Sequence, residues 1–144
     1  MPTRPIRQVI RDRKLLTAPR ELSVHEAARL MARESVGALL IIESHRLVGI
    51  FTERDAVHRV LAAGRDANAT TLAEVMTADP VTVSADRPLN HALHIMYESG
   101  FRHVPVTEDG RVVGVVSARD ALGPELTQFE AELRERDELA ERMR

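Results

Sequence analysis

The feature that most constrains this chain is an internal repeat. When the 144-residue sequence is shifted by 65 positions, residues 27–56 align with residues 92–121 without a gap. Nine positions are then identical, including the triplets Arg54-Asp55-Ala56 and Arg119-Asp120-Ala121. Each copy has about 60 residues and is small for an independent core, so we expect the two copies to pack face to face about a pseudo-twofold axis.

Each copy has the pattern of a short strand, a helix, two strands and a second helix. In the first copy, Ser23-Val24-His25-Glu26 is a capping-box sequence, which predicts that a helix starts there. The β-branched runs 36–42 and 47–51 predict a β-hairpin, and the second copy carries a stronger turn sequence at 108–110. The sequence therefore predicts a mixed α/β (α+β) fold of two β-α-β-β-α repeats.

The rest of the chain connects and flanks these repeats. We assign an N-terminal segment (1–14), a first repeat (15–64), a connecting segment with a short helix (65–79), a second repeat (80–122) and a charged C-terminal helix (123–144). The N-terminal segment carries net charge +4 and the C-terminal helix −3, so the two ends could meet within or between subunits. The narrow apolar stripe of the C-terminal helix favours packing on its own body or on a partner subunit over a free coiled coil.

Composition excludes several classes of protein. With 44% hydrophobic and 29% charged residues the chain is a folded, soluble protein, and no apolar run is long enough to span a membrane. A net charge of −2 and four aromatic residues argue against nucleic-acid binding. The absence of cysteine excludes disulfides and thiolate chemistry and agrees with a cytoplasmic location.

Each hairpin ends in the same short motif. Thr52 is followed three positions later by Asp55, and Ser117 by Asp120. One interpretation is a helix cap, in which the hydroxyl accepts from a backbone amide and the carboxylate favours the positive end of the helix dipole. The other is a ligand site, because a helix N-terminus suits an anion and a carboxylate can accept two hydrogen bonds from a vicinal diol. The local sequence favours capping, and both can hold for the same residues.

Other chemistry has little support. His91, His94 and Glu98 share one helix face and could in principle hold a metal, but they lie opposite the apolar stripe and are expected to face water. No Ser-His-Asp order or carboxylate pair stands out, so we expect neither a metal site nor a catalytic one.

The repeated unit resembles the CBS domain, which occurs in tandem pairs called Bateman modules. The resemblance covers about residues 6–122 and rests on three features, of which the first two occur in both copies and the third only in the second. These are the Ala-x-x-x-Met helix (Ala27/Met31 and Ala92/Met96), the Gly-hydrophobic-hydrophobic-Thr/Ser-x-x-Asp ending, and the His-Val-Pro-Val strand start at His103. It implies a stand-alone signal-transduction module.

The resemblance also implies a ligand. CBS pairs bind adenosine compounds such as AMP, ATP, NAD or S-adenosylmethionine in the cleft between repeats. In that family the aspartate of the motif holds the ribose and the Ser/Thr contacts ribose or phosphate. Residues of the strands frame the adenine ring. Carried onto this sequence, the implied contacts are Thr17, Val36, Ala38, Thr52, Asp55, Thr82, Phe101, His103, Ser117 and Asp120.

The two copies differ in their basic residues. Arg102-His103 stands where the first copy has Gly37-Ala38, and this pair resembles the phosphate-contacting pair of the regulatory γ subunit of AMP-activated kinase. Its alternative role is an exposed basic pair in a loop. Arg54 and Arg119 lie in the first turn of their helices, where the helix dipole disfavours a cation. Their position is explained if they face a phosphate or the neighbouring aspartate.

Two functions remain in competition. The first is a non-enzymatic sensor that binds an adenine nucleotide, requires no other cofactor, forms a homodimer and signals to a separate protein partner. The alternative is a ligand-free dimerisation or scaffold module in which the two motifs only cap helices.

Overall fold

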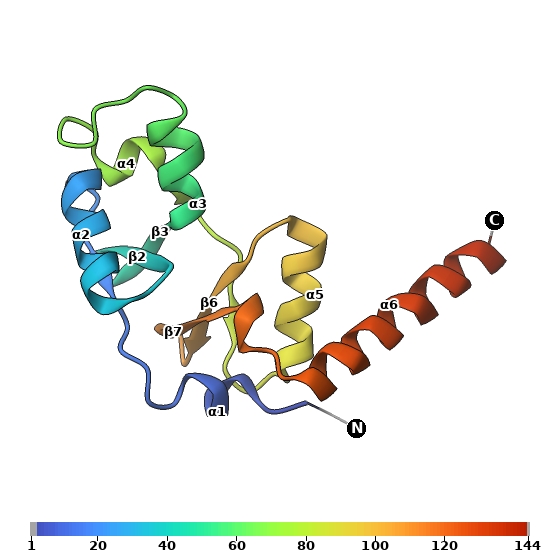
Figure 1. The fold of residues 1–144 in the computed structure, drawn as a ribbon. Coiled ribbons are helices and arrows are strands. Elements are labelled where there is room, and N and C mark those ends of the chain that lie inside the picture. The colour runs from blue at the N-terminus through green and yellow to red at the C-terminus, as the bar shows by residue number, and fades with distance from the viewer. Residues whose placement is uncertain (1–2, 144) are drawn as a thin grey trace.

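The computed structural model describes residues 3–143, which form two repeats and one long C-terminal helix (Figure 1). The first half contains α1 (Ile6–Ile10), β1 (Thr17–Ala18), α2 (Val24–Glu34), β2 (Ala38–Glu43), β3 (Arg46–Thr52), α3 (Glu53–Asp55), η1 (Ala56–Leu61), α4 (Leu72–Val75) and β4 (Thr77–Ala78). The second half contains β5 (Val83–Ser84), α5 (Leu89–Ser99), β6 (His103–Glu108), β7 (Arg111–Ser117), η2 (Ala118–Asp120) and α6 (Gly123–Arg142).

Each repeat builds its own sheet. The strand orders are β1-β2-β3-β4 in the first repeat and β5-β6-β7 in the second. In both sheets the first two strands run parallel and the hairpin strands antiparallel. The registers are also equivalent, since Ala38 pairs with Thr52 and, 65 residues later, His103 pairs with Ser117. The mixed α/β fold with a repeated unit is thereby confirmed.

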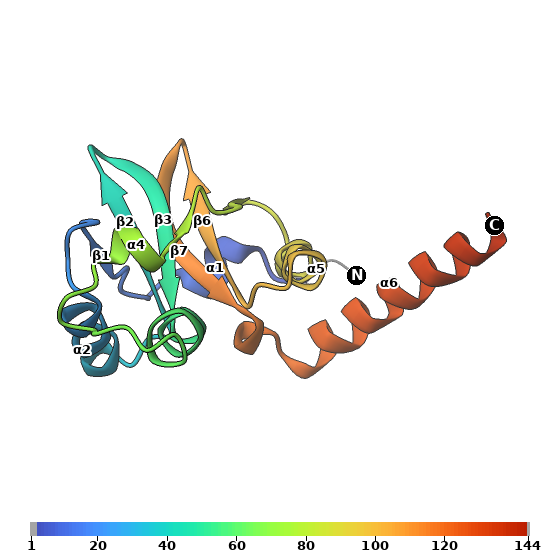
Figure 2. The same ribbon diagram turned by 90° about the horizontal axis from the view of Figure 1, so that it is seen from above.

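The hairpin of the first repeat is buried on both faces. Leu39 and Phe51 pack toward α2 in the core of that repeat. Leu40 and Ile50 point the other way and form a second cluster, against which Val115 of the second repeat packs. Figure 2 shows the two hairpins lying side by side. Burial on both faces explains why β2 is apolar at nearly every position rather than at alternate ones.

The short helix preceding each repeat packs on the other repeat. Ile10 of α1 belongs to the core of the second repeat, and Val75 of α4 belongs to the core of the first. Each short helix or the residue just after it contacts a glycine of the opposite repeat, and the two glycines occupy the same position in the repeat. A methyl group added at Gly114 would meet Ile10, and one added at Gly49 would meet Met76, just after α4.

The last helix of the two repeats differs. In the first repeat α3 continues into the π-helical η1, whereas in the second the helix expected there is a single 3₁₀ turn, η2. Pro124 is the physical reason, because it has no amide hydrogen to continue a helix and restricts the preceding residue, yet it fits the first turn of a new one. The C-terminal helix α6 accordingly begins at Gly123 with a proline in its first turn.

The first half of α6 packs on α5, and the remainder extends away from the body (Figure 1, Figure 2). Glu132 accepts from Asn90 Nδ2 at 2.7 Å and lies 2.9 Å from His94 Nε2, while the rings of His94 and Phe129 meet edge to face at 4.7 Å. The expectation that His94 faces water is therefore wrong, because α6 covers it. Within residues 3–143 no cluster of His, Asp or Glu could hold a metal ion.

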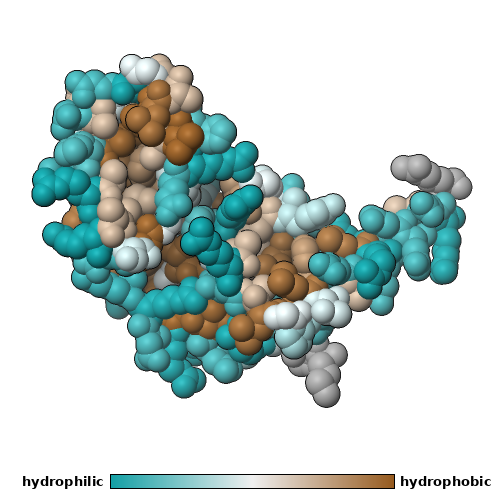
Figure 3. All heavy atoms as spheres, in the orientation of Figure 1, coloured by the Kyte–Doolittle hydropathy of each residue, from teal (hydrophilic) through white to brown (hydrophobic). Residues whose placement is uncertain are grey.

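Some apolar side chains on the first repeat stay exposed. Val57 and Leu61 of η1 are 51% and 72% exposed. Figure 3 shows apolar surface gathered over this part of the molecule. Among the helices described, none combines the length and apolar character of a membrane span.

Candidate ligand site

The first motif, Thr52 and Asp55, forms a reciprocal cap at the start of α3. The Asp55 amide donates to Thr52 Oγ1 at 3.2 Å, and Asp55 Oδ2 accepts from the amide and the hydroxyl of Thr52 at 3.0 and 3.1 Å. The other carboxylate oxygen, Oδ1, lies 3.6 Å from Arg59 Nε, and 13% of the Asp55 side chain is exposed. Asp55 Oδ1 therefore lies beyond hydrogen-bond distance of Arg59 Nε.

The second motif, Ser117 and Asp120, repeats the cap with different surroundings. Asp120 Oδ2 accepts from the Ser117 amide at 2.7 Å. Its Oδ1 lies 2.6 Å from Arg13 Nη2, and 9% of the side chain is exposed. The capping interpretation is thus confirmed in full for the first motif and, through its carboxylate, for the second. Ligand binding by the same residues stays a prediction.

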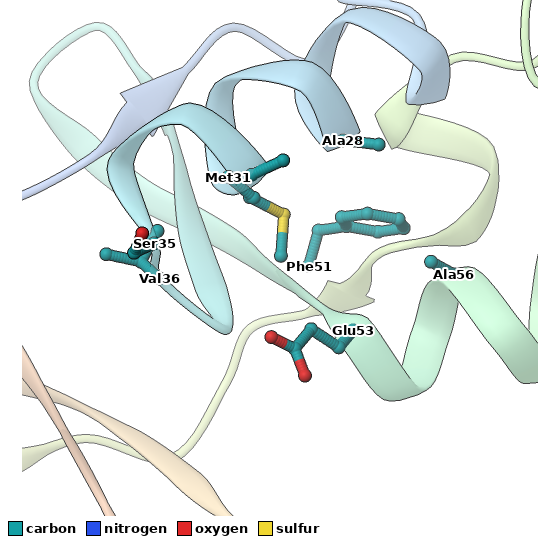
Figure 4. A pocket seen from close by; sticks show the side chains of 8 residues that line it. Ala28, Met31, Ser35, Val36, Phe51, Glu53 and Ala56 are labelled. Carbon is teal, nitrogen blue, oxygen red and sulfur yellow. The ribbon is translucent and has the colours of Figure 1, made fainter.

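A cavity of about 350 Å³ adjoins the first motif. Its walls come from α2, the segment that follows it, the end of β3 and the start of α3 and η1, and Figure 4 shows Phe51 at its centre and Glu53 at its edge. The residues that line it are Ala28, Met31, Ala32, Ser35, Val36, Phe51, Glu53 and Ala56. Its volume lies within the range of about 300–1,000 Å³ of small-molecule sites. The lining is largely apolar, with one carboxylate, and flanks Thr52 and Asp55 in the sequence.

The two repeats meet where His103 of the second copy lies against Gly37 of the first. A Cβ added at Gly37 would lie 3.1 Å from His103 Nε2 and 3.3 Å from Glu53 Oε1. Burial lowers the pKa of His103, while the nearby carboxylates of Glu53 and Asp120 oppose that shift. His103 therefore lies at the boundary between repeats, beside a carboxylate of the first copy.

The remaining residues implied by the resemblance lie in different parts of the fold. Arg54 donates to the carbonyl of Gly100 in the other repeat at 3.2 Å. It therefore links the two repeats, whereas the sequence left open a contact with the neighbouring aspartate. Phe101, Arg102 and Arg119 are exposed. Val36 lines the cavity, Ala38 is buried at the start of β2, Thr17 is exposed on β1, and Thr82 is exposed just before β5.

Sequence reasoning missed three residues near the motifs: Arg13, Glu53 and Arg59. Arg59 could have been found, because an aspartate and an arginine four positions apart on a helix commonly pair. Glu53 lies inside the motif itself, but its neighbour His103 comes from the other repeat. Arg13 could not have been found from a local pattern, because it lies far from Asp120 in the sequence and the fold brings the two together.

Two equivalent α/β repeats, each ending in the same capped Thr/Ser-x-x-Asp motif, define a tandem-repeat protein with one candidate site per repeat. The chain belongs to the CBS domain family, whose model matches residues 6–62 and 72–123.

Relatives and solved structures agree with this assignment. The CBS domain-containing protein CBSCBSPB3 of Arabidopsis thaliana is 35% identical over 122 residues, which are 84% of this chain and 22% of that relative. The chain therefore spans about a fifth of that relative's length. A structure of a candidate signal-transduction protein with CBS domains from Burkholderia ambifaria is 31% identical, with TM-score 0.75 over 80% of this chain and 88% of that one.

A second structure contains a ligand. The CBS domain protein of Pyrobaculum aerophilum complexed with AMP is 25% identical and aligns with TM-score 0.79 over 89% of this chain and 99% of that chain.

Proposed function

We propose that this protein is a non-catalytic regulatory module that binds an adenine nucleotide at its two Thr/Ser-x-x-Asp motifs and signals to a separate partner. The observation that carries the proposal is the doubled motif, in which each carboxylate lies at a helix start beside a backbone amide. The AMP complex of the similar Pyrobaculum protein supports the ligand class. We place the protein in the cytoplasm.

Each residue has a chemical role in this proposal. Asp55 Oδ1 would accept from a ribose hydroxyl, since Oδ2 already serves the cap. The cavity beside the first motif would take the adenine ring, because its walls are apolar and its size fits a small ligand. Arg102, Arg119 and His103 would face the phosphate, and phosphate would favour the charged form of His103 that burial disfavours.

A melting experiment tests the proposal. AMP, ATP, NAD and S-adenosylmethionine are each added in excess and unfolding is followed by circular dichroism. A ligand at 100 times its Kd adds about 2.7 kcal/mol, which raises Tm by several degrees in a domain of this size. Asp55→Asn and Asp120→Asn are matched variants, because asparagine keeps an oxygen for the cap but replaces the other oxygen with a donor.

The scaffold alternative is favoured by a specific observation, since each motif carboxylate already accepts a hydrogen bond from the backbone amide of its own motif. The two functions predict different outcomes. A sensor is stabilised by at least one of the four compounds. Each Asp→Asn variant loses the part of the shift that its own site contributes, and the double variant loses all of it. Without ligand, Asp120→Asn should melt below the wild type, because it also loses the contact with Arg13. If none of the four compounds moves Tm, the scaffold function replaces the sensor.

A further inference from the structure

The two motif aspartates differ in how fully their oxygens are occupied. At Asp120, Oδ2 accepts from the Ser117 amide at 2.7 Å and Oδ1 lies 2.6 Å from Arg13 Nη2. At Asp55, the arginine on Oδ1 is Arg59, and its Nε lies 3.6 Å away. The Arg13 contact is therefore the shorter, charge-assisted one, and it uses the oxygen that a ribose hydroxyl would need.

The segment carrying Arg13 is fixed to the second repeat. Ile10 is buried in that core, and the Arg13 amide donates to the Ile10 carbonyl at 3.1 Å. Upstream, Arg4 donates to the Asp120 backbone carbonyl at 2.9 Å and to Glu125 of α6 at 2.7 Å. Asp120 is therefore held through both its side chain and its backbone by one N-terminal segment, so the position of Arg13 is set by the fold.

We propose that Arg13 closes the second site, so that ligand fills the Thr52/Asp55 site first and fills the Ser117/Asp120 site only by displacing Arg13. This inference rests on the proposed function, because it concerns the regulation of the same two sites. Displacing Arg13 breaks its charge-assisted hydrogen bond with Asp120. An uncharged nucleoside offers the Arg13 guanidinium no anion in place of that carboxylate. A phosphorylated ligand brings a new anion for it, so the second site discriminates against adenosine more strongly than the first does.

Calorimetric titration with adenosine tests the closure. In the Asp55→Asn background only the second site can use a carboxylate, and Arg13→Ala should tighten adenosine binding there about tenfold, the worth of one charge-assisted hydrogen bond. Arg11→Ala is the charge-matched control, because it removes an exposed arginine two positions away and should leave the affinity unchanged. In the Asp120→Asn background, which keeps the first site, Arg13→Ala should have no effect.

The outcomes separate the closure from the function. Unchanged adenosine affinity on adding Arg13→Ala to Asp55→Asn overturns the closure, while binding to Asp120→Asn still supports the sensor. No binding of adenosine or AMP to the wild type or to Arg13→Ala removes both. If Asp55→Asn does not fold, the wild-type background decides: Arg13→Ala should bring the two binding steps closer together, and an unaltered isotherm counts against the proposal.

Discussion

The turn of the first hairpin contains two residues that are unusual in their backbone conformation. Ser44 and His45 have φ of +48° and +65°, in the left-handed region that disfavours a Cβ. The equivalent turn of the second repeat uses Asp109 and Gly110, with φ of +52° and +77°. The first repeat therefore carries a steric cost that a glycine relieves in the second.

We predict that His45→Gly stabilises the protein by about 0.5–1 kcal/mol, because glycine adopts positive φ without the Cβ clash. Urea unfolding at neutral pH measures the change in the free energy of unfolding. The matched control is Gly110→His, which should destabilise by a similar amount. A His45→Gly protein that unfolds at lower urea than the wild type would contradict the prediction.

At the scale of elements, local sequence patterns predicted most of the fold. Ser23 accepts from the Glu26 amide at 3.1 Å, so α2 starts where the capping sequence placed it, and both hairpins form. The sequence predicted a short helix in the connecting segment, but it did not show that α1 and α4 each pack on the other repeat. Contacts of the N-terminal segment join residues more than 100 positions apart, as Arg4 and Asp120 are joined across 116 positions, and local periodicity carries no information about them.

The sequence likewise predicted one part of the candidate site and not the other. Its motifs and caps follow from residues three positions apart, so sequence was sufficient for them. The approach of Arg13 to Asp120 and of His103 to Glu53 depends on how the two repeats and the N-terminal segment pack. Tertiary packing therefore makes the two copies unequal, beyond the Arg102-His103 difference that sequence already showed.

The exchanged helices give a prediction at this scale. A methyl group at Gly114 would lie 2.9 Å from Ile10 Cδ1 and 3.2 Å from its Cβ, so Gly114→Ala should destabilise the protein by about 1–3 kcal/mol. Ile10→Ala also destabilises the protein, because Ile10 is buried, but the double variant should lose less than the sum of the two single losses, since the side chain that collides is then absent. Thermal unfolding of the two single variants and the double variant measures the coupling.

The equivalent change in the first repeat is the control. Gly49→Ala meets mainly the thioether of Met76, a flexible side chain that can move, so its cost should be smaller than that of Gly114→Ala. Strictly additive effects of Gly114→Ala and Ile10→Ala would show that the close approach of α1 to β7 does not limit stability.

At the scale of the whole molecule, the N-terminal segment and the start of the C-terminal helix meet, as the opposite charges of the two segments indicated. Arg4 forms a bidentate contact with Glu125, whose pKa is lowered chiefly by the hydrogen bond from that guanidinium. The contact ties the N-terminal segment to the start of α6 within one chain. The molecule nevertheless leaves Val57 and Leu61 of η1 exposed.

We predict that the exposed apolar side chains of η1 lie in a homodimer interface, because large apolar side chains exposed together on one helix mark an interaction surface. Light scattering at micromolar concentration should give twice the 16.1 kDa chain mass. Leu61→Asp should yield monomers, since a charge placed in an apolar interface costs several kcal/mol unless it is paired. Leu139→Asp on the projecting part of α6 is the matched control and should remain dimeric; if it alone dissociates the dimer, the interface lies on α6 instead.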